Sequence, residues 1–194
     1  MKYYFKKVVM ILVAAVVAMG MMSVPAAAKS YELIEYGVPV GNTYFKTYMS
    51  YKAITDTTSA QYELQQEAYT DDNGLRKIGS YYVVAMGNYY AKNIGDKFLI
   101  YLDTGEKIKV IIGDFKSDEH TDETNRYRNV YDSNGNYVSK NVIEFIVDMI
   151  TLDETAKNWG DISAIDKFKG NISAIYKLEE KSYEREWYKQ WKIF

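Results

Sequence analysis

Short apolar segments that recur at close intervals from Ser80 onward constrain the fold of this chain more than any other feature. They are rich in β-branched and aromatic residues and are bounded by Gly, Asp or Asn, which is typical of β-strands. The segments are "YYVVAM", "DKFLIYL", "KIKVII", "NVIEFIVD" and "NISAIYKL". The pattern predicts a mainly β domain, either a small barrel or a sandwich, with a hairpin turn at 103–106 between the second and third strands.

Capping-box patterns predict two short helices. Thr58 and Gln61 have the spacing that starts a helix over 59–68, and Thr151 and Glu154 have the spacing that starts another over 152–159. Gly160 is expected to end the second helix.

The first 28 residues have the pattern of an export signal. Three lysines precede an apolar core at 8–18, and small residues at 26–28 follow Pro25 as a cleavage site. An uncleaved anchor is the alternative, because 8–28 carries no charge. We expect a signal peptide over 1–28, an N-terminal extension over 29–79, the β domain over 80–178 and a C-terminal tail over 179–194. Cleavage would leave a secreted protein without a stable membrane span.

The net charge argues against a nucleic-acid partner, and the absence of cysteine excludes disulfide bonds. The chain has a net charge of −2, and removing the three signal lysines makes it −5. An acidic chain offers no electrostatic footprint for nucleic acid, so we expect no nucleic-acid partner. The chain has no cysteine, so burial of apolar side chains must stabilise it without disulfides.

The segment "IIGDFKSDEHTDETN", 111–125, places five carboxylates around His120, the only histidine. Asp114 follows an apolar strand and Glu144 lies inside one. A carboxyl group in such a place can donate a proton if burial or a like charge raises its pKa. His120 and Asp122 are candidates to orient a substrate or share a proton. The alternatives are a hydrated loop, an outward-facing Glu144 and an Asp114 that caps a turn.

The same segment does not predict a metal or cofactor site. One histidine without cysteine lacks the donors that zinc prefers, so we expect neither a transition metal nor another cofactor. The stretch "DSNGNYVSKNVIE", 132–144, has its glycine in the fourth rather than the sixth place of a calcium loop. It predicts a hairpin turn at Asn134-Gly135 instead.

The C-terminal tail carries aromatic residues at helical spacing. Tyr183, Trp187 and Trp191 are four residues apart and predict a helix with one aromatic face. That face is expected to pack on the domain. The alternative is contact with a partner, a glycan or a membrane surface, and a structural component of the cell envelope could use such a tail for assembly.

Residues 81–178 together resemble the three-aspartate, or 3D, domain, a double-psi β-barrel found in bacterial cell-wall enzymes such as stationary-phase-type lytic transglycosylases. The segments that follow the order of the family's elements are "VVAMG", "NIGDKFLIYL", "IIGDFK", "NVIEFIVD", "DETAKNWG" and "NISAIYKL". The resemblance implies a six-stranded double-psi β-barrel with short helices. It makes Asp114 and Glu144 the counterparts of the aspartates in the family's "ADTG" turn and "NRID" strand.

The resemblance also implies a function. It indicates a secreted, cell-wall-associated protein that acts on peptidoglycan or another cell-wall polysaccharide by lytic transglycosylase-like chemistry. Asp114 would then be the general acid and base, with Glu144, His120 and Asp122 around the groove. Met86-Gly87-Asn88 stands where the family has its first aspartate, which favours the alternative of a non-catalytic module that binds glycan or protein in the same groove. The oligomeric state stays open.

Overall fold

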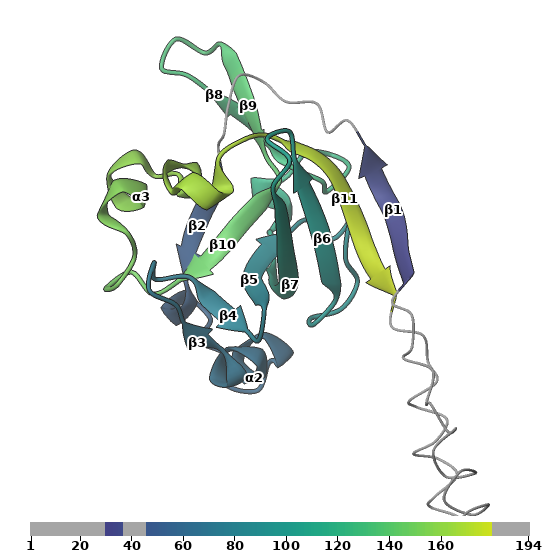
Figure 1. Cartoon of the computed structure of the whole chain (residues 1–194), viewed down its shortest axis with the longest axis vertical. Helices are drawn as coiled ribbons and strands as arrows, with labels where there is room; N and C mark the ends of the chain where they lie inside the picture. The colour runs from purple at the N-terminus through teal and green to yellow at the C-terminus, as the bar shows by residue number, and fades with distance from the viewer. Residues whose placement is uncertain (1–29, 37–45, 180–194) are drawn as a thin grey trace, which may run out of the picture. The chain divides into compact units, whose positions relative to one another are not determined.

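The computed structural model describes residues 30–36 and 46–179 (Figure 1). The predicted signal peptide at 1–28 and the predicted tail helix around Trp187 lie outside the described residues. So does the segment 37–45.

Eleven strands account for most of the regular structure in the described ranges. They are β1 (Ser30–Tyr36), β2 (Thr47–Ser50), β3 (Tyr69–Thr70), β4 (Arg76–Ile78), β5 (Tyr81–Met86), β6 (Lys97–Leu102), β7 (Lys107–Phe115), β8 (Arg128–Tyr131), β9 (Tyr137–Asn141), β10 (Ile143–Val147) and β11 (Ile172–Glu179). The helices are α2 (Ala60–Glu67) and α3 (Glu154–Trp159), with 3₁₀ turns η1 (Tyr51–Ala53), η2 (Asp118–His120), η3 (Ile162–Ala164) and η4 (Asp166–Phe168). The prediction of a mainly β domain is confirmed.

Nine of these strands form one sheet in the order β1-β11-β6-β7-β5-β10-β2, with β3 and β4 attached beside β5. The β5–β7 and β10–β2 pairs are parallel. Strands β1 and β2 stand at the two ends of this path, so the described residues form an open sheet, and no closed barrel is seen among them. The N-terminal segment 30–36 and the segment 47–78 therefore contribute strands to the same sheet as residues 81–179.

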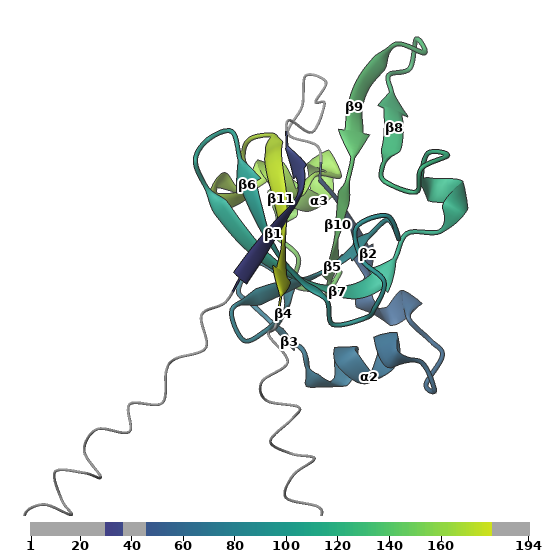
Figure 2. The same ribbon diagram turned by 90° about the vertical axis from the view of Figure 1, so that its right-hand side faces the viewer.

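A second, two-stranded sheet consists of β8 and β9. Figures 1 and 2 show this hairpin projecting from one end of the main sheet, with α2 at the other end. Only Val142 separates β9 from β10, so the hairpin is a direct extension of the main sheet. The predicted turn at Asn134-Gly135 is confirmed, because Gly135 has φ +81° and its N–H donates to Asp132 O at 3.0 Å.

Both helices lie where the sequence predicts them. The cap of α2 is Ser59, whose side chain accepts from Tyr62 N, rather than Thr58. Asp153 caps α3 in the same way, two residues later than the Thr151 cap predicted. Gly160 ends α3 in the left-handed conformation, φ +66°, as expected for a glycine at this position.

The sheet buries apolar side chains on both faces around β5, β7 and β10. Tyr82, Val84 and Met86 of β5 belong to the larger core, and Val83 between them belongs to a smaller cluster with Ile111 and Ile146. Residues of α2 and η1 pack against this smaller cluster. Side chains alternate between the faces of a strand, so even-numbered residues of β5 face the larger core and odd-numbered ones face α2.

A bulge at Gly113 decides which face Asp114 occupies. The β5–β7 register runs from Val84↔Ile112 to Ala85↔Asp114 and skips Gly113. Without this extra residue, alternation would send Asp114 to the opposite face. The strand predicted to end at Ile112 in fact continues as β7 to Phe115, so Asp114 lies inside the sheet.

Candidate functional site

A polar row crosses four neighbouring strands on the face that carries the smaller cluster. Glu144 of β10 pairs with Thr47 of β2 on one side and with Ala85 of β5 on the other, and Ala85 pairs with Asp114 of β7. Residues paired across strands point to the same face. With about 4.8 Å between strands, the backbones of Asp114 and Glu144 are on the order of 10 Å apart. The sheet thus places the two predicted acids in one row, separated by a small alanine.

Asp114 is half-buried, and its carboxyl group has a perturbed environment. Burial raises the pKa of this carboxyl, and the negative charge of Glu144 raises it further. Two hydrogen bonds oppose that effect: Phe115 N–H donates to Asp114 Oδ1 at 2.9 Å, and the Gln61 side chain of α2 donates as well. A half-buried acid beside a second acid has the environment of a proton donor.

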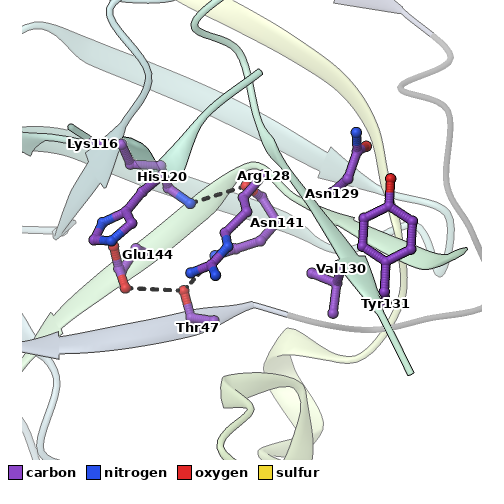
Figure 3. A pocket seen from close by; sticks show the side chains of 9 residues that line it. All are labelled: Thr47, Lys116, His120, Arg128, Asn129, Val130, Tyr131, Asn141 and Glu144. Carbon is purple, nitrogen blue, oxygen red and sulfur yellow. Dashed lines mark hydrogen bonds between the residues drawn. The ribbon is translucent and has the colours of Figure 1, made fainter. Parts of the chain in front are cut away.

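Glu144 lines a pocket of about 380 Å³, which is within the range of small-ligand sites. Figure 3 shows its side chains coming from β2, β10, the β8–β9 hairpin and the loop after β7. They are Thr47, Lys116, His120, Arg128, Asn129, Val130, Tyr131, Asn141 and Glu144. The structure therefore brings His120 and Glu144 to one cavity. Asp114 is not among the lining residues; it lies on the same face as Glu144, across Ala85, and interacts with it electrostatically.

A hydrogen-bond network holds the floor of this pocket. Thr47 Oγ1 lies 3.3 Å from Glu144 Oε1 and 2.6 Å from the Asn141 amide. All polar atoms of Asn141 are paired when its oxygen faces Thr47 and Lys116 and its nitrogen donates to Ile143 O at 2.7 Å. Lys116 Nζ also donates to the backbone oxygen of Asn141 at 2.9 Å. Glu144, an acid within an apolar strand, is thus stabilised by a polar floor on its own face.

Lys116 is an almost fully buried cation, with 6% of its surface exposed. Burial lowers the pKa of its ammonium to about 8; the charge of Glu144 opposes this effect and the charge of Arg128 adds to it. Near neutral pH the group remains mostly charged. The pocket therefore combines a fixed ammonium, the Arg128 guanidinium and the Glu144 carboxylate.

Asp122 stabilises its own loop. Its carboxylate accepts from Arg126 N at 3.0 Å and from Thr124 Oγ1 at 2.8 Å. Burial is the largest single influence and raises the pKa of this carboxyl, but the hydrogen bonds from the loop together outweigh burial and lower the pKa overall. The loop also packs closely on Gly87, where a Cβ would lie 1.9 Å from Asn125 O. Asp122 is not among the residues that line the pocket. Its hydrogen bonds to Thr124 and Arg126 within its own loop do not support the predicted pairing with His120.

Seven of the nine pocket residues escaped the sequence prediction, and four of them, Thr47, Lys116, Arg128 and Asn141, supply its hydrogen-bond network and its cations. Thr47 reaches the site through a parallel pairing with β10, about a hundred residues away, which carries no local signal. Lys116 lies in a charged segment that predicts exposure, because lysine is seldom buried. The aromatic and β-branched residues of "RYRNVY" at 126–131, just before the Asn-Gly turn, are the signal that could have located β8 and hence Arg128.

Within residues 30–36 and 46–179, no group of three or more His, Asp or Glu side chains is arranged to hold a metal ion. In the same ranges, no helix combines the length and apolar character needed to cross a membrane. No family model matches the chain, and neither does any curated protein or solved structure.

Proposed function

We propose that this protein is a secreted bacterial protein that cleaves or remodels peptidoglycan, with the pocket at Glu144 as its sugar-binding site. One observation carries the proposal: Asp114 and Glu144 flank Ala85 on one face, and the pKa of Asp114 is raised. The export pattern of 1–28 supports the location. The order β5, β6, β7, β10, α3, β11 supports kinship with double-psi β-barrel cell-wall enzymes.

The chemistry assigned to the two acids follows from their surroundings. Asp114, whose pKa is raised by burial and by the charge of Glu144, gives a proton to the glycosidic oxygen as the bond to the anomeric carbon breaks. The ionised Glu144 stabilises the positive charge that develops on the sugar ring. The resulting Asp114 carboxylate then takes the proton from the sugar's own 6-hydroxyl, whose oxygen attacks the anomeric carbon. The product is an anhydro-sugar, and Asp114 is returned to its starting state.

His120 and Asp122 have lesser roles in this proposal. His120 lines the pocket and is placed to contact the sugar. Asp122 keeps the loop 122–127 in shape through its backbone hydrogen bonds.

The test is digestion of purified peptidoglycan, with soluble products analysed by mass spectrometry. Wild-type protein should release anhydro-muropeptides. Asp114→Asn should reduce release at least a hundredfold, in line with the contribution of a general acid, and Glu144→Gln should also reduce it. Asp118→Asn, which changes an exposed acid of η2 outside the pocket, is the matched control and should retain activity. Wild-type release by Asp114→Asn would overturn the catalytic role.

The second candidate is a non-catalytic module that binds cell-wall glycan. The electrostatic interaction between the buried Lys116 ammonium and Glu144 favours it, because a carboxylate partly compensated by a buried ammonium can serve to hold a ligand without reacting. In a sedimentation assay with insoluble peptidoglycan, this candidate requires retention of the protein without release of soluble sugar. Failure to sediment would count against both candidates.

A further inference from the structure

The pocket has an excess of positive charge in an acidic protein. Lys116 and Arg128 line it, against the single carboxylate of Glu144. The chain as a whole has a net charge of −2, so this cavity differs in sign from its surroundings. Local charge of this kind selects ligands by their own charge.

Lys116 is held in place before any ligand arrives. Its ammonium donates to Asn141 O at 2.9 Å, and only 6% of the residue is exposed. Burying an ammonium costs free energy unless a ligand or partner compensates it. A buried, oriented cation at the wall of a polar pocket is therefore a recognition group for an anion.

Arg128 supplies the second cation from β8. Figure 3 shows its side chain directed toward Thr47 and Glu144. Among the residues that the structure describes, the Arg128 guanidinium forms no ion pair, whereas Arg126, two residues earlier, pairs with Glu35 at 3.5 Å. A guanidinium matches a carboxylate with two parallel hydrogen bonds.

We infer that this pocket recognises a sugar that carries a carboxylate, with Arg128 forming the bidentate pair and Lys116 contributing the second positive charge. A single negative charge matches the excess of one positive charge that Lys116 and Arg128 leave over Glu144. A phosphate dianion would bring further negative charge next to Glu144. This inference rests on the proposed function and specifies its substrate class: the lactyl ether of muramic acid or a uronic acid.

The test compares N-acetylmuramic acid with N-acetylglucosamine, which differ by the carboxylate-bearing lactyl group. Amide chemical shifts of isotope-labelled protein are followed during titration with each sugar. We expect N-acetylmuramic acid to bind about tenfold more tightly, as a charge-assisted pair contributes. Equal affinities would overturn the inference.

Variants separate the two cations. Arg128→Gln should abolish the tenfold preference, and because Arg128 is exposed the fold should tolerate the change. Lys116→Met should reduce the preference, with its folded state checked by circular dichroism. Lys109→Gln, an exposed lysine of β7 outside the pocket, should leave the preference unchanged. A preference that survives Arg128→Gln would refute the assigned contact.

Two further ligands, glucuronic acid and inorganic phosphate, show whether the pocket recognises the lactyl group, any sugar carboxylate or any anion. Binding of glucuronic acid equal to that of N-acetylmuramic acid supports recognition of any sugar carboxylate, and weaker binding supports the lactyl group. Inorganic phosphate that binds as tightly as either sugar would overturn the carboxylate assignment. Carboxylate preference without cleavage of peptidoglycan would refute only the catalytic function. Cleavage that is equally fast on N-acetylglucosamine polymers would refute only the present inference.

Discussion

Replacing Gly113 with alanine should destabilise the protein through one steric conflict. An ideal Cβ at this position would lie 2.2 Å from Val83 Cγ1 and 3.1 Å from Ile146 Cδ1. Non-bonded carbons pack at about 3.5–4.0 Å, so Val83 would have to move by more than an ångström. Val83 and Ile146 are fully buried and have no open space to enter. Overpacking of a core costs about 1–3 kcal/mol, and we expect a loss near the upper end, about 3 kcal/mol.

A double-mutant cycle isolates this conflict. Val83→Ala alone should cost roughly 1.5–3 kcal/mol through lost burial and an incompletely filled cavity. In Gly113→Ala/Val83→Ala the offending Cγ1 is absent, so the double variant should be more stable than the sum of the single losses by about 1–3 kcal/mol. Urea unfolding followed by circular dichroism gives the four free energies. Additive losses, or a Gly113→Ala variant within about 0.5 kcal/mol of wild type, would show that the bulge does not pack as described.

Three other expectations concern buried polar groups. The pKa of Lys116 is lowered to about 8 in the folded state and has its ordinary value in the unfolded state. Between these two pKa values the unfolded chain binds more protons than the folded one, so stability rises with pH. In chemical unfolding, the stability of wild type relative to Lys116→Met should rise by roughly 3 kcal/mol from pH 8 to pH 10.5. The pKa of Asp114 is raised in the folded state, so wild type loses stability as the pH rises from the unfolded-state pKa of this carboxyl to its folded-state pKa. Asp114→Asn should therefore melt at a higher temperature than wild type at pH 7. If the difference in melting temperature persisted at pH 2, the ionisation of Asp114 would not be its cause. The Tyr90 side chain is 3% exposed, and its hydroxyl donates a hydrogen bond to the Glu35 carboxylate. Tyr90→Phe should therefore lower the free energy of unfolding by about 1.5–3 kcal/mol. Tyr89→Phe, which changes an exposed ring, should leave the free energy of unfolding nearly unchanged.

Strands with a strong apolar pattern could be predicted from sequence, and polar or very short ones could not. The segments now seen as β5, β6, β7, β10 and β11 carry β-branched and aromatic residues that favour strands wherever they lie. Strand β2, "TYMS", depends on its parallel pairing with β10 and has no such pattern. The β8–β9 hairpin lies within a segment whose polar residues predict a loop, although its Asn-Gly turn was recognisable.

The candidate site shows the same division. Glu144 could be identified because a charge inside "VIEFIV" needs a partner or a groove. Asp114 was found as the residue after an apolar strand, but its face depends on the bulge at Gly113, for which a glycine inside a strand is only a general indication. Lys116 could not be found, because its burial depends on acceptors at Asn141, which the fold brings close from β9.

The most direct test of a glycan site in this pocket is an amide chemical-shift map with a soluble peptidoglycan fragment containing N-acetylmuramic acid. The largest shifts should fall at Thr47, Lys116, Asn141 and Glu144, together with the β8 strand of the hairpin. Shifts centred on the half-buried ring pair Tyr101 and Tyr176 of β6 and β11, or no shifts at all, would contradict the assignment of this pocket.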